Sequence, residues 1–314
     1  MAGYILRRLL LTLPTLLLVA LAVFVLMRAI PGDPVLLMLG DSADAAQAAE
    51  LRQRMGLDEP LPLQFGHWLL QAVRGDLGAS ITNGEAVMPL ILDRFGVSAV
   101  IVLLAVAAAA MVAVPLGLLA AWKQDQTLDL AVVAGATLLL SVPSFWLGLL
   151  MLLVFGMKLG WLPVVGYVAF NDDWRQALLY IVLPVVTLTL IEIGALARMA
   201  RASAIEVLRL EYVTHARAKG AGEGRVLWRH VLPNAFAPTL TLIGLVLGNL
   251  LGGIAVLETV FTLPGLGRLL VDAIFARDYP VVQGCLLFTA VIYVIVNLIV
   301  DLMYPLFDPR VSAA

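Results

Sequence analysis

Long runs of apolar residues, separated by short polar stretches, dominate the chain. A helix needs about 20 apolar residues to cross the ~30 Å hydrocarbon core of a bilayer. Six runs reach this length, at approximately Leu9 to Ile30, Val97 to Ala121, Leu130 to Phe155, Ala177 to Leu196, Ala235 to Leu257 and Val281 to Tyr304. The pattern therefore predicts six transmembrane helices. Four prolines inside these runs or near their ends predict kinks or close packing: Pro14, Pro115, Pro143 and Pro184.

Composition agrees with this pattern. The 314 residues are 62% hydrophobic and 13% charged, whereas soluble domains have roughly 25% charged residues. The first apolar run continues to Met27 without a small-residue cleavage site, so we interpret it as a retained span and not as a signal peptide. The single cysteine, Cys285, can form no internal disulfide. The expected fold class is an all-α integral membrane protein.

Basic residues near the short connections predict the orientation of the spans. Arg7 and Arg8 precede the first span, Lys123 follows the second, and Arg310 follows the sixth. Seven further Lys/Arg lie between Arg198 and Pro233, after the fourth span. All of these positions fall on one side of a six-span chain, which the positive-inside rule assigns to the cytoplasm. Both termini are therefore expected to be cytoplasmic.

This orientation divides the chain into three predicted parts. Residues 1–30 form the cytoplasmic N-terminus and the first span, residues 31–96 a large extracytoplasmic helical loop, and residues 97–314 the core of helices two to six, including segment 198–233. Within the loop, one helix is predicted from Ser42 to its stop at Gly56, and an amphipathic one from Pro62 to Val73.

The basic segment 198–233 has its own predicted structure. Glu211 to Lys219 is a short helix candidate, and Gly220 is a good C-terminal stop. A second helix runs from about Glu223 to Val231, and Leu232-Pro233 leads into the fifth span. An ordinary positive-inside loop is the simplest interpretation of this composition, but the spacing favours a more specific one.

Gly220, nine residues, and then His230-Val-Leu-Pro233 resemble the coupling motif (EAA motif) of bacterial ABC importer permeases. Further segments match signatures of the peptide class of that superfamily: Pro31-Gly-Asp-Pro34, Gly56-Leu-Asp58 with Pro60, Gly75-Asp-Leu-Gly78, Leu162-Pro-Val-Val-Gly166, Ala216-Arg-Ala-Lys-Gly220, Pro264-Gly-Leu-Gly-Arg-Leu269, Arg277-Asp-Tyr-Pro280 and Asp308-Pro-Arg310. The chain resembles the first of the two permease subunits in dipeptide, oligopeptide, nickel or glutathione importers. The sequence departs from the general motif at Thr214 and His215, which stand where it has Glu and Ala, and at His230. Glu211 is the acidic residue nearest to position 214 and could take the place of the missing Glu.

The resemblance implies the type I permease fold in a bacterial inner membrane. It also implies three kinds of partner besides the lipid bilayer: a homologous second permease, two cytoplasmic ATPases and an extracytoplasmic substrate-binding protein. ATP and Mg would be bound by the ATPases, because this chain has no Gly-x-x-x-x-Gly-Lys-Ser/Thr phosphate loop. The permease itself is not expected to be an enzyme. Nothing points to nucleic acid.

A cytoplasmic coupling helix between spans four and five is the site that the resemblance implies. Its residues are expected to dock on an ATPase: Glu211, Tyr212, Val213, Thr214, His215, Ala216, Arg217, Ala218, Lys219 and Gly220, with Leu232 and Pro233 at the return to the membrane. We expect Gly220→Asp or Arg217→Glu to leave the complex in the membrane but to uncouple transport from ATP hydrolysis.

Polar residues inside the spans are candidates for the substrate pathway: Glu192, Asn249, Glu258 and Asn297. Each also has a structural interpretation. Glu258, like Asp301, is near a span end, where solvation or a salt bridge is common; Glu192 could pair with Arg198; the two asparagines could join helices by hydrogen bonds.

Other classes of function receive less support. His67, His215 and His230 have no metal-ligand spacing, so no metal site is expected. No protease signature is present. A secondary transporter driven by an ion gradient remains the alternative, although the predicted midplanes carry few charges; a membrane scaffold is a third. Whether the substrate is a dipeptide, an oligopeptide, glutathione or a nickel chelate stays open, as does whether the two ATPases are identical.

Overall fold

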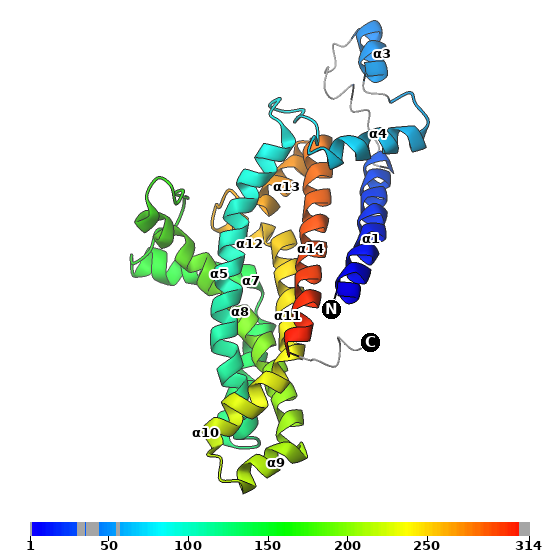
Figure 1. The fold of residues 1–314 in the computed structure, drawn as a ribbon. Helices are drawn as coiled ribbons and strands as arrows, with labels where there is room; N and C mark the ends of the chain where they lie inside the picture. The colour runs from blue at the N-terminus through cyan, green and yellow to red at the C-terminus, as the bar shows by residue number, and fades with distance from the viewer. Residues whose placement is uncertain (1, 30–34, 36–43, 55–56, 308–314) are drawn as a thin grey trace.

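The computed structural model describes residues 2–29, 35, 44–54 and 57–307, and the regular structure in these ranges is helical (Figure 1). The elements in chain order are α1 (Ala2–Ala29), α3 (Ala45–Arg54), α4 (Leu61–Val73), α5 (Val87–Trp122), α6 (Thr127–Ser141), α7 (Ser144–Met151), η1 (Leu152–Lys158), α8 (Trp174–Leu208), α9 (Glu211–Ala218), α10 (Glu223–Arg225), η2 (Val226–Val231), α11 (Leu232–Gly253), α12 (Ala255–Val260), α13 (Leu266–Phe275) and α14 (Tyr279–Phe307). The segments η1 and η2 are π-helical. An isolated antiparallel bridge pairs Ala79 with Ala86.

Five helical stretches are long and apolar enough to cross a membrane, which confirms five of the predicted runs as helices. They are Leu10–Ala29, Val87–Trp122, Trp174–Leu208, Glu223–Gly252 and Tyr279–Met303. The chain is therefore a multi-pass membrane protein. Helices α1, α5 and α8 continue through Pro14, Pro115 and Pro184. Because α5 already begins at Val87, the predicted boundary between residues 96 and 97 falls inside this helix.

The predicted third span, Leu130 to Phe155, is not one continuous helix. Its two halves, Thr127–Ser141 and Ser144–Lys158, are bent by 96° relative to each other. Pro143 causes the break, because the residue before a proline avoids the helical conformation. Val142 is accordingly extended, with φ −91° and ψ 124°. The two halves together count as a sixth span only if the bent pair crosses the membrane as a unit.

Small residues allow the central helices to pack closely. At the α5–α8 contact, a Cβ on Gly117 would lie 2.7 Å from the carbonyl oxygen of Ala197. At the α11–α14 contact, a Cβ on Gly248 would lie 2.6 Å from the ring of Tyr293, and one on Gly252 2.6 Å from the Thr289 methyl group. Spaced small residues of this kind bring membrane helices together where apolar burial gives little driving force.

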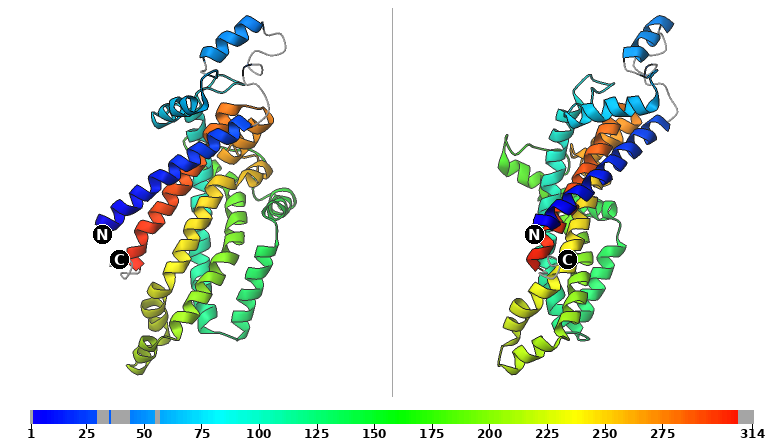
Figure 2. Two further views of the ribbon diagram at one scale, coloured as in Figure 1. Left: turned by 90° about the vertical axis from the view of Figure 1, so that its right-hand side faces the viewer. Right: turned by 45° about the vertical axis from the view of Figure 1, so that its right-hand side comes forward.

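The molecule has two distinct ends (Figures 1 and 2). One end, which we call the outer end, carries α4, the 79–86 turn and α13; the other carries α9 and α10 and is called the α9 end. Helix α1 lies beside α14 and touches α4. There Phe24 of α1 contacts Phe65 and Trp68 of α4, with ring centroids 5.4 and 5.9 Å apart.

The helices predicted in the outer loop are present. Helix α4 matches the predicted amphipathic stretch, and α3 lies within the other. The predicted start at Ser42 and stop at Gly56 lie outside the described residues, as do Pro31 to Pro34 and Asp308 to Arg310.

Candidate functional site

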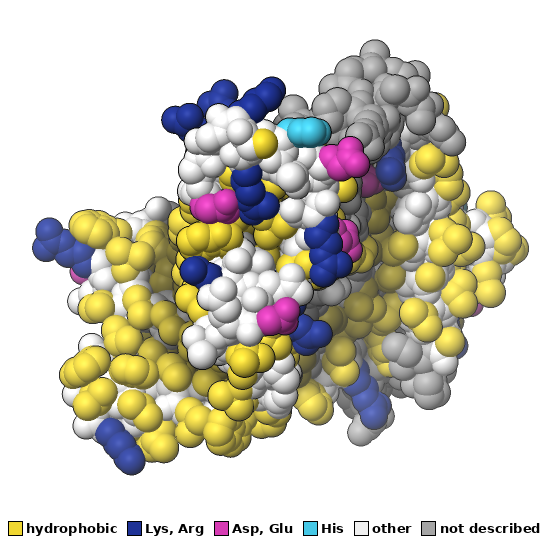
Figure 3. Space-filling view, turned by 90° about the horizontal axis from the view of Figure 1, so that it is seen from below, with side chains coloured by type: hydrophobic (Ala, Val, Ile, Leu, Met, Phe, Trp, Pro, Cys, Tyr) yellow, Lys and Arg dark blue, Asp and Glu magenta, His cyan; other side chains and the backbone are white. Residues whose placement is uncertain are grey.

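Helix α9 occupies the tip of the molecule because α8 extends beyond the thickness of a bilayer. Thirty-five residues of α8 correspond to ~52 Å at about 1.5 Å per residue, whereas the hydrocarbon core is ~30 Å thick. Figure 3 looks onto this end and shows Lys and Arg side chains gathered around the tip, among a largely hydrophobic surrounding surface. Helix α8 is thus long enough to carry polar side chains at the tip beyond the hydrocarbon, where charged groups avoid the cost of burial in lipid.

Gly220 ends α9 as the sequence predicts. Its φ is +83°, in the left-handed region that favours glycine. The Ala221 N–H donates to the Ala216 carbonyl at 3.2 Å, and the Gly220 N–H donates to the Arg217 carbonyl at 2.9 Å. These two bonds form a Schellman motif, which satisfies carbonyl groups that the helix end leaves free. The chain therefore leaves α9 sharply and returns through η2.

Helix α9 is anchored to the membrane helices by one buried residue. Val213 is 0% exposed and packs in a cluster with Leu118 of α5 and Val226 of η2. This burial corrects one predicted role: Val213 faces the protein interior and does not offer a docking contact. The Tyr212 hydroxyl donates to the His230 carbonyl at 3.1 Å, which adds a polar link between α9 and η2.

A bidentate ion pair also braces α9. Arg217 donates from Nε and from a terminal nitrogen to the two carboxylate oxygens of Glu223, at 2.8 and 3.1 Å. Both side chains stay partly accessible, at 36% and 39% exposure. Arg217, predicted as a docking residue, thus has a partner within its own chain.

The remaining predicted coupling residues surround a pocket or lie on the surface. The pocket has a volume of about 560 Å³ and is lined by Tyr212, His215, Ala216, Lys219, Gly220, Ala221, Arg225 and His230. No carboxylate belongs to this lining. The structure therefore brings together His215 and His230, which the sequence treats as scattered, beside two cations. Four other predicted residues are exposed: Glu211, Thr214, Ala218 and Pro233. Leu232 is half-buried.

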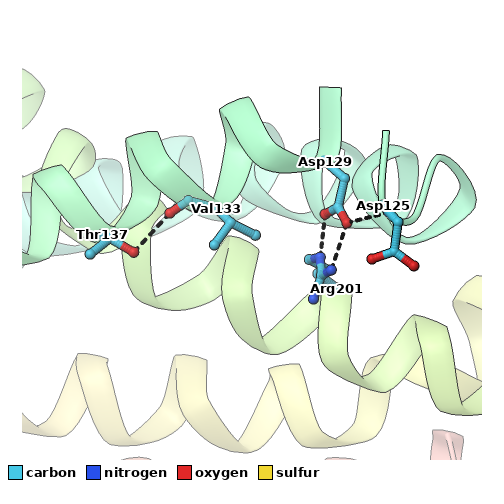
Figure 4. A network of polar contacts seen from close by, with 5 residues as sticks. All are labelled: Asp125, Asp129, Val133, Thr137 and Arg201. Carbon is cyan, nitrogen blue, oxygen red and sulfur yellow. Dashed lines mark hydrogen bonds and ion pairs between the residues drawn. The ribbon is translucent and has the colours of Figure 1, made fainter. Parts of the chain in front are cut away.

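Asp129 and Arg201 form a junction near the α9 end that the sequence interpretation missed (Figure 4). Arg201 of α8 donates two hydrogen bonds to the Asp129 carboxylate of α6, one at 2.6 Å. The Asp125 N–H donates to the same carboxylate at 2.9 Å. Asp129 is only 2% exposed. The only signal for this pair in the sequence is that Asp129 lies just before the predicted third span and Arg201 just after the fourth, with opposite charges.

The predicted pathway residues separate into three places. Asn249 and Asn297 line one groove of about 650 Å³ between α1, α11 and α14. Arg8 and Asp301 also line this groove, and their side chains pair at 2.7 Å. The groove brings together the two uncharged candidates, which are 48 residues apart (297 − 249) in the sequence.

Glu192 and Glu258 lie elsewhere. Glu192 is half-buried on α8 and forms no ion pair with Arg198 in the described part of the chain. Glu258 is 0% exposed, and its carboxylate accepts hydrogen bonds from Ser98 and from the Arg268 N–H. A side chain enclosed in this way cannot contact a substrate in this conformation. In this conformation Glu258 therefore does not line a substrate pathway, in contrast to the role considered for it.

Comparison with known proteins decides the family. Residues 113–313 match the family described as binding-protein-dependent transport system inner membrane component. Residues 1–102 match its N-terminal counterpart. The chain belongs to this family.

Three relatives are similar to this chain over nearly its whole length. A Brucella suis protein named as a peptide transport system permease is 42% identical over 311 residues, covering 99% of each chain. The oligopeptide transport system permease of Bacillus subtilis is 37% identical over 315 residues, covering 99% of this chain and 100% of its own. The glutathione transport system permease of Salmonella choleraesuis is 39% identical over 311 residues, covering 99% of each chain. The chain is thus a permease subunit of an ABC importer.

As a transport permease, the chain is a membrane component and not an enzyme. Among the residues that the structure describes, no three His, Cys, Asp or Glu side chains lie close enough to hold a metal ion.

Proposed function

We propose that this permease forms half of the translocation pathway of an importer for di- or oligopeptides, coupled through α9 to ATP hydrolysis by partner subunits. Nickel chelates and glutathione are alternative substrates of the same mechanism. The observation that carries the proposal is α9 itself: a short helix at the tip of the molecule, ended at Gly220 and anchored by buried Val213. The substrate class rests on the names of the relatives, which refer to peptides, oligopeptides and glutathione.

In this proposal the chain crosses the bacterial inner membrane six times, with the bent pair α6 and α7–η1 counted as one span. Both termini and α9 face the cytoplasm. Support comes from Lys123, which connects α5 and α6 at the α9 end, and from the basic residues around α9 itself. Cytoplasmic loops of membrane proteins are enriched in such residues.

The proposed partners are a second permease, two ATPases that bind ATP and Mg, and an extracytoplasmic binding protein. Helix α9 would dock on one ATPase. The pocket lined by Lys219, Arg225, His215 and His230 carries positive charge without a carboxylate in its lining, which fits acidic side chains on the ATPase surface. ATP-driven closure of the ATPases would then move α9 and the helices fixed to it as a rigid body.

The groove beside α1 is the proposed wall of the pathway. Asn249 and Asn297 offer amide donors and acceptors without a fixed charge. Such groups suit the peptide backbone, which is common to substrates with different side chains.

Reconstitution with the neighbouring transport proteins tests this proposal. The permease is co-expressed with the second permease and the ATPases, purified, and placed in vesicles with the binding protein and labelled dipeptides. Co-purification of both ATPase subunits and uptake that requires ATP are expected. Gly220→Asp should reduce uptake while the complex still assembles and hydrolyses ATP. Gly222→Ala is the matched control, since Gly222 has an ordinary negative φ and open space at its Cβ position.

The alternatives give different results. Uptake that follows an imposed ion gradient without ATP, and that an ionophore abolishes, would contradict the proposal in favour of a secondary transporter. Competition of dipeptide uptake by glutathione or by chelated nickel would redirect the substrate class but keep the mechanism.

A further inference from the structure

A fully enclosed carboxylate joins three helices at the outer end. Glu258 of α12 is 0% exposed, and Ser98 of α5 is 1% exposed. The Ser98 hydroxyl donates to one Glu258 oxygen at 2.6 Å, and the Arg268 N–H donates to the other at 2.8 Å. The Leu266 N–H of α13 donates in turn to the Ser98 hydroxyl at 2.8 Å. The carboxylate, the hydroxyl and the start of α13 thus form one connected unit.

The residues at the start of α13 leave space for this carboxylate and offer it N–H donors. The first N–H groups of a helix have no partner within the helix, and the positive end of its dipole faces an anion favourably. Gly265, immediately before α13, leaves the space that the carboxylate occupies, because a Cβ there would overlap it. A Cβ on Gly267 would lie 2.7 Å from the Cα of Ala255. The glycines in the motif from Pro264 to Leu269 therefore allow the start of α13 to pack directly against the Glu258 carboxylate.

Helix α5 connects this unit with α9. It is continuous from Val87 to Trp122. Ser98 lies in its outer part, and Val114, Leu118 and Ala121 in its other part belong to the buried cluster that anchors Val213. The separation of Ser98 and Leu118 along the helix axis is ~30 Å at about 1.5 Å per residue. A continuous helix packed at both ends can carry a displacement from one end to the other, and α5 stays helical through Pro115.

We propose that Glu258 is a positioning residue that ties α12 and α13 to α5, so that movement of the outer face reaches α9. This role rests on the proposed coupling function of α9. It predicts that the loaded binding protein, acting at the outer end, stimulates ATP hydrolysis by way of this contact. A merely structural carboxylate would affect folding and leave the stimulation of correctly assembled complexes unchanged.

The test compares Glu258→Gln and Ser98→Ala with wild type in assembled, vesicle-reconstituted complexes. The readout is the ATPase rate with saturating peptide-loaded binding protein divided by the rate without it. Because mutations along a coupling route change coupling by about 0.5–2 kcal/mol, which corresponds to ~2- to ~30-fold, we expect the ratio to fall at least ~2-fold in Glu258→Gln and less in Ser98→Ala. Basal ATPase activity should be retained. Asp272→Asn, an exposed acid on α13 with a side chain 68% exposed, is the control and should keep the wild-type ratio.

A wild-type ratio in both Glu258→Gln and Ser98→Ala would overturn the proposal. So would a parallel fall of basal and stimulated rates, because that outcome reports damage to the fold alone. If Glu258→Gln does not assemble, Ser98→Ala decides: a lowered ratio supports the role, and an unchanged ratio overturns it. Failure of the proposed function itself would look different, as a wild-type chain that purifies without ATPase subunits.

Discussion

Two carboxylates at the outer end are enclosed, whereas the carboxylate that braces α9 is partly open to solvent. At the outer end, Glu258 and Asp278 are 0% and 2% exposed, and hydroxyl and N–H groups surround both carboxylates. At the α9 end, Glu223 is paired with Arg217 but stays 39% exposed. A buried charge that loses its partners is costly, whereas an exposed pair contributes little to stability. The comparison indicates that the outer end is built to hold one arrangement, and that α9 with its Arg217–Glu223 brace stays accessible to a partner.

The largest effect is expected from filling the space beside Glu258. Gly265→Ala places a methyl group where the carboxylate lies, so the carboxylate must leave its donors or α13 must shift. We expect destabilisation of about 3 kcal/mol or more, seen as a loss of monodisperse protein in size-exclusion chromatography. Gly96→Ala in α5 is the control, because no atom lies within 4 Å of its Cβ position. A normal yield and melting temperature for Gly265→Ala would show that the outer end can rearrange around the added methyl group, which would contradict a single fixed arrangement there.

These outer contacts also mark the limit of what the sequence predicts. Apolar runs and the Gly220 stop are local signals, and both lead to helices that the structure contains. The pairs Ser98–Glu258 and Ser80–Asp278 join residues 160 and 198 positions apart, and no local pattern encodes such a contact. Pro143 is intermediate: the sequence identifies a site of bending, but the neighbouring helices decide between a kink and the observed 96° break.

A smaller effect is expected at the second buried carboxylate. Asp278 accepts from Ser80 Oγ at 2.5 Å, Thr82 Oγ1 at 2.9 Å and the Ile81 N–H at 3.2 Å. Burial acts to raise the pKa of Asp278, but the hydrogen bonds from Ser80, Ile81 and Thr82 outweigh it, and the pKa lies below its usual value. Asp278→Asn removes the charged acceptor and should cost about 1–3 kcal/mol.

The lowered pKa of Asp278 fixes the direction of the pH dependence. Stability from this group is complete above the unfolded pKa of ~3.9 and is lost as the pH falls through the lower folded value. The difference in melting temperature between wild type and Asp278→Asn should therefore be constant at neutral pH and shrink below about pH 4. A gap that widens on acidification would contradict the assignment of Asp278 as a stabilising anion.

The smallest effect on stability is expected at the Arg217–Glu223 pair, where the effect on transport should nevertheless be large. Exposed ion pairs contribute about 0.2–1 kcal/mol, so Arg217→Glu and Glu223→Arg should lower the melting temperature by no more than ~4 °C. Both should reduce ATP-driven uptake, because the pair fixes α9 relative to the helix that follows it.

The double variant Arg217→Glu/Glu223→Arg separates two explanations of that loss. If the pair acts as an internal brace, reversing both charges rebuilds it and uptake recovers towards the wild-type rate. If uptake stays low while the melting temperature is normal, Arg217 acts on a carboxylate of the ATPase that the swap cannot replace. The first result would show that a carboxylate fixes the position of α9, as Glu258 and Asp278 fix helices at the outer end. The second would sharpen the contrast, since charge at that end would then serve the partner and not the fold.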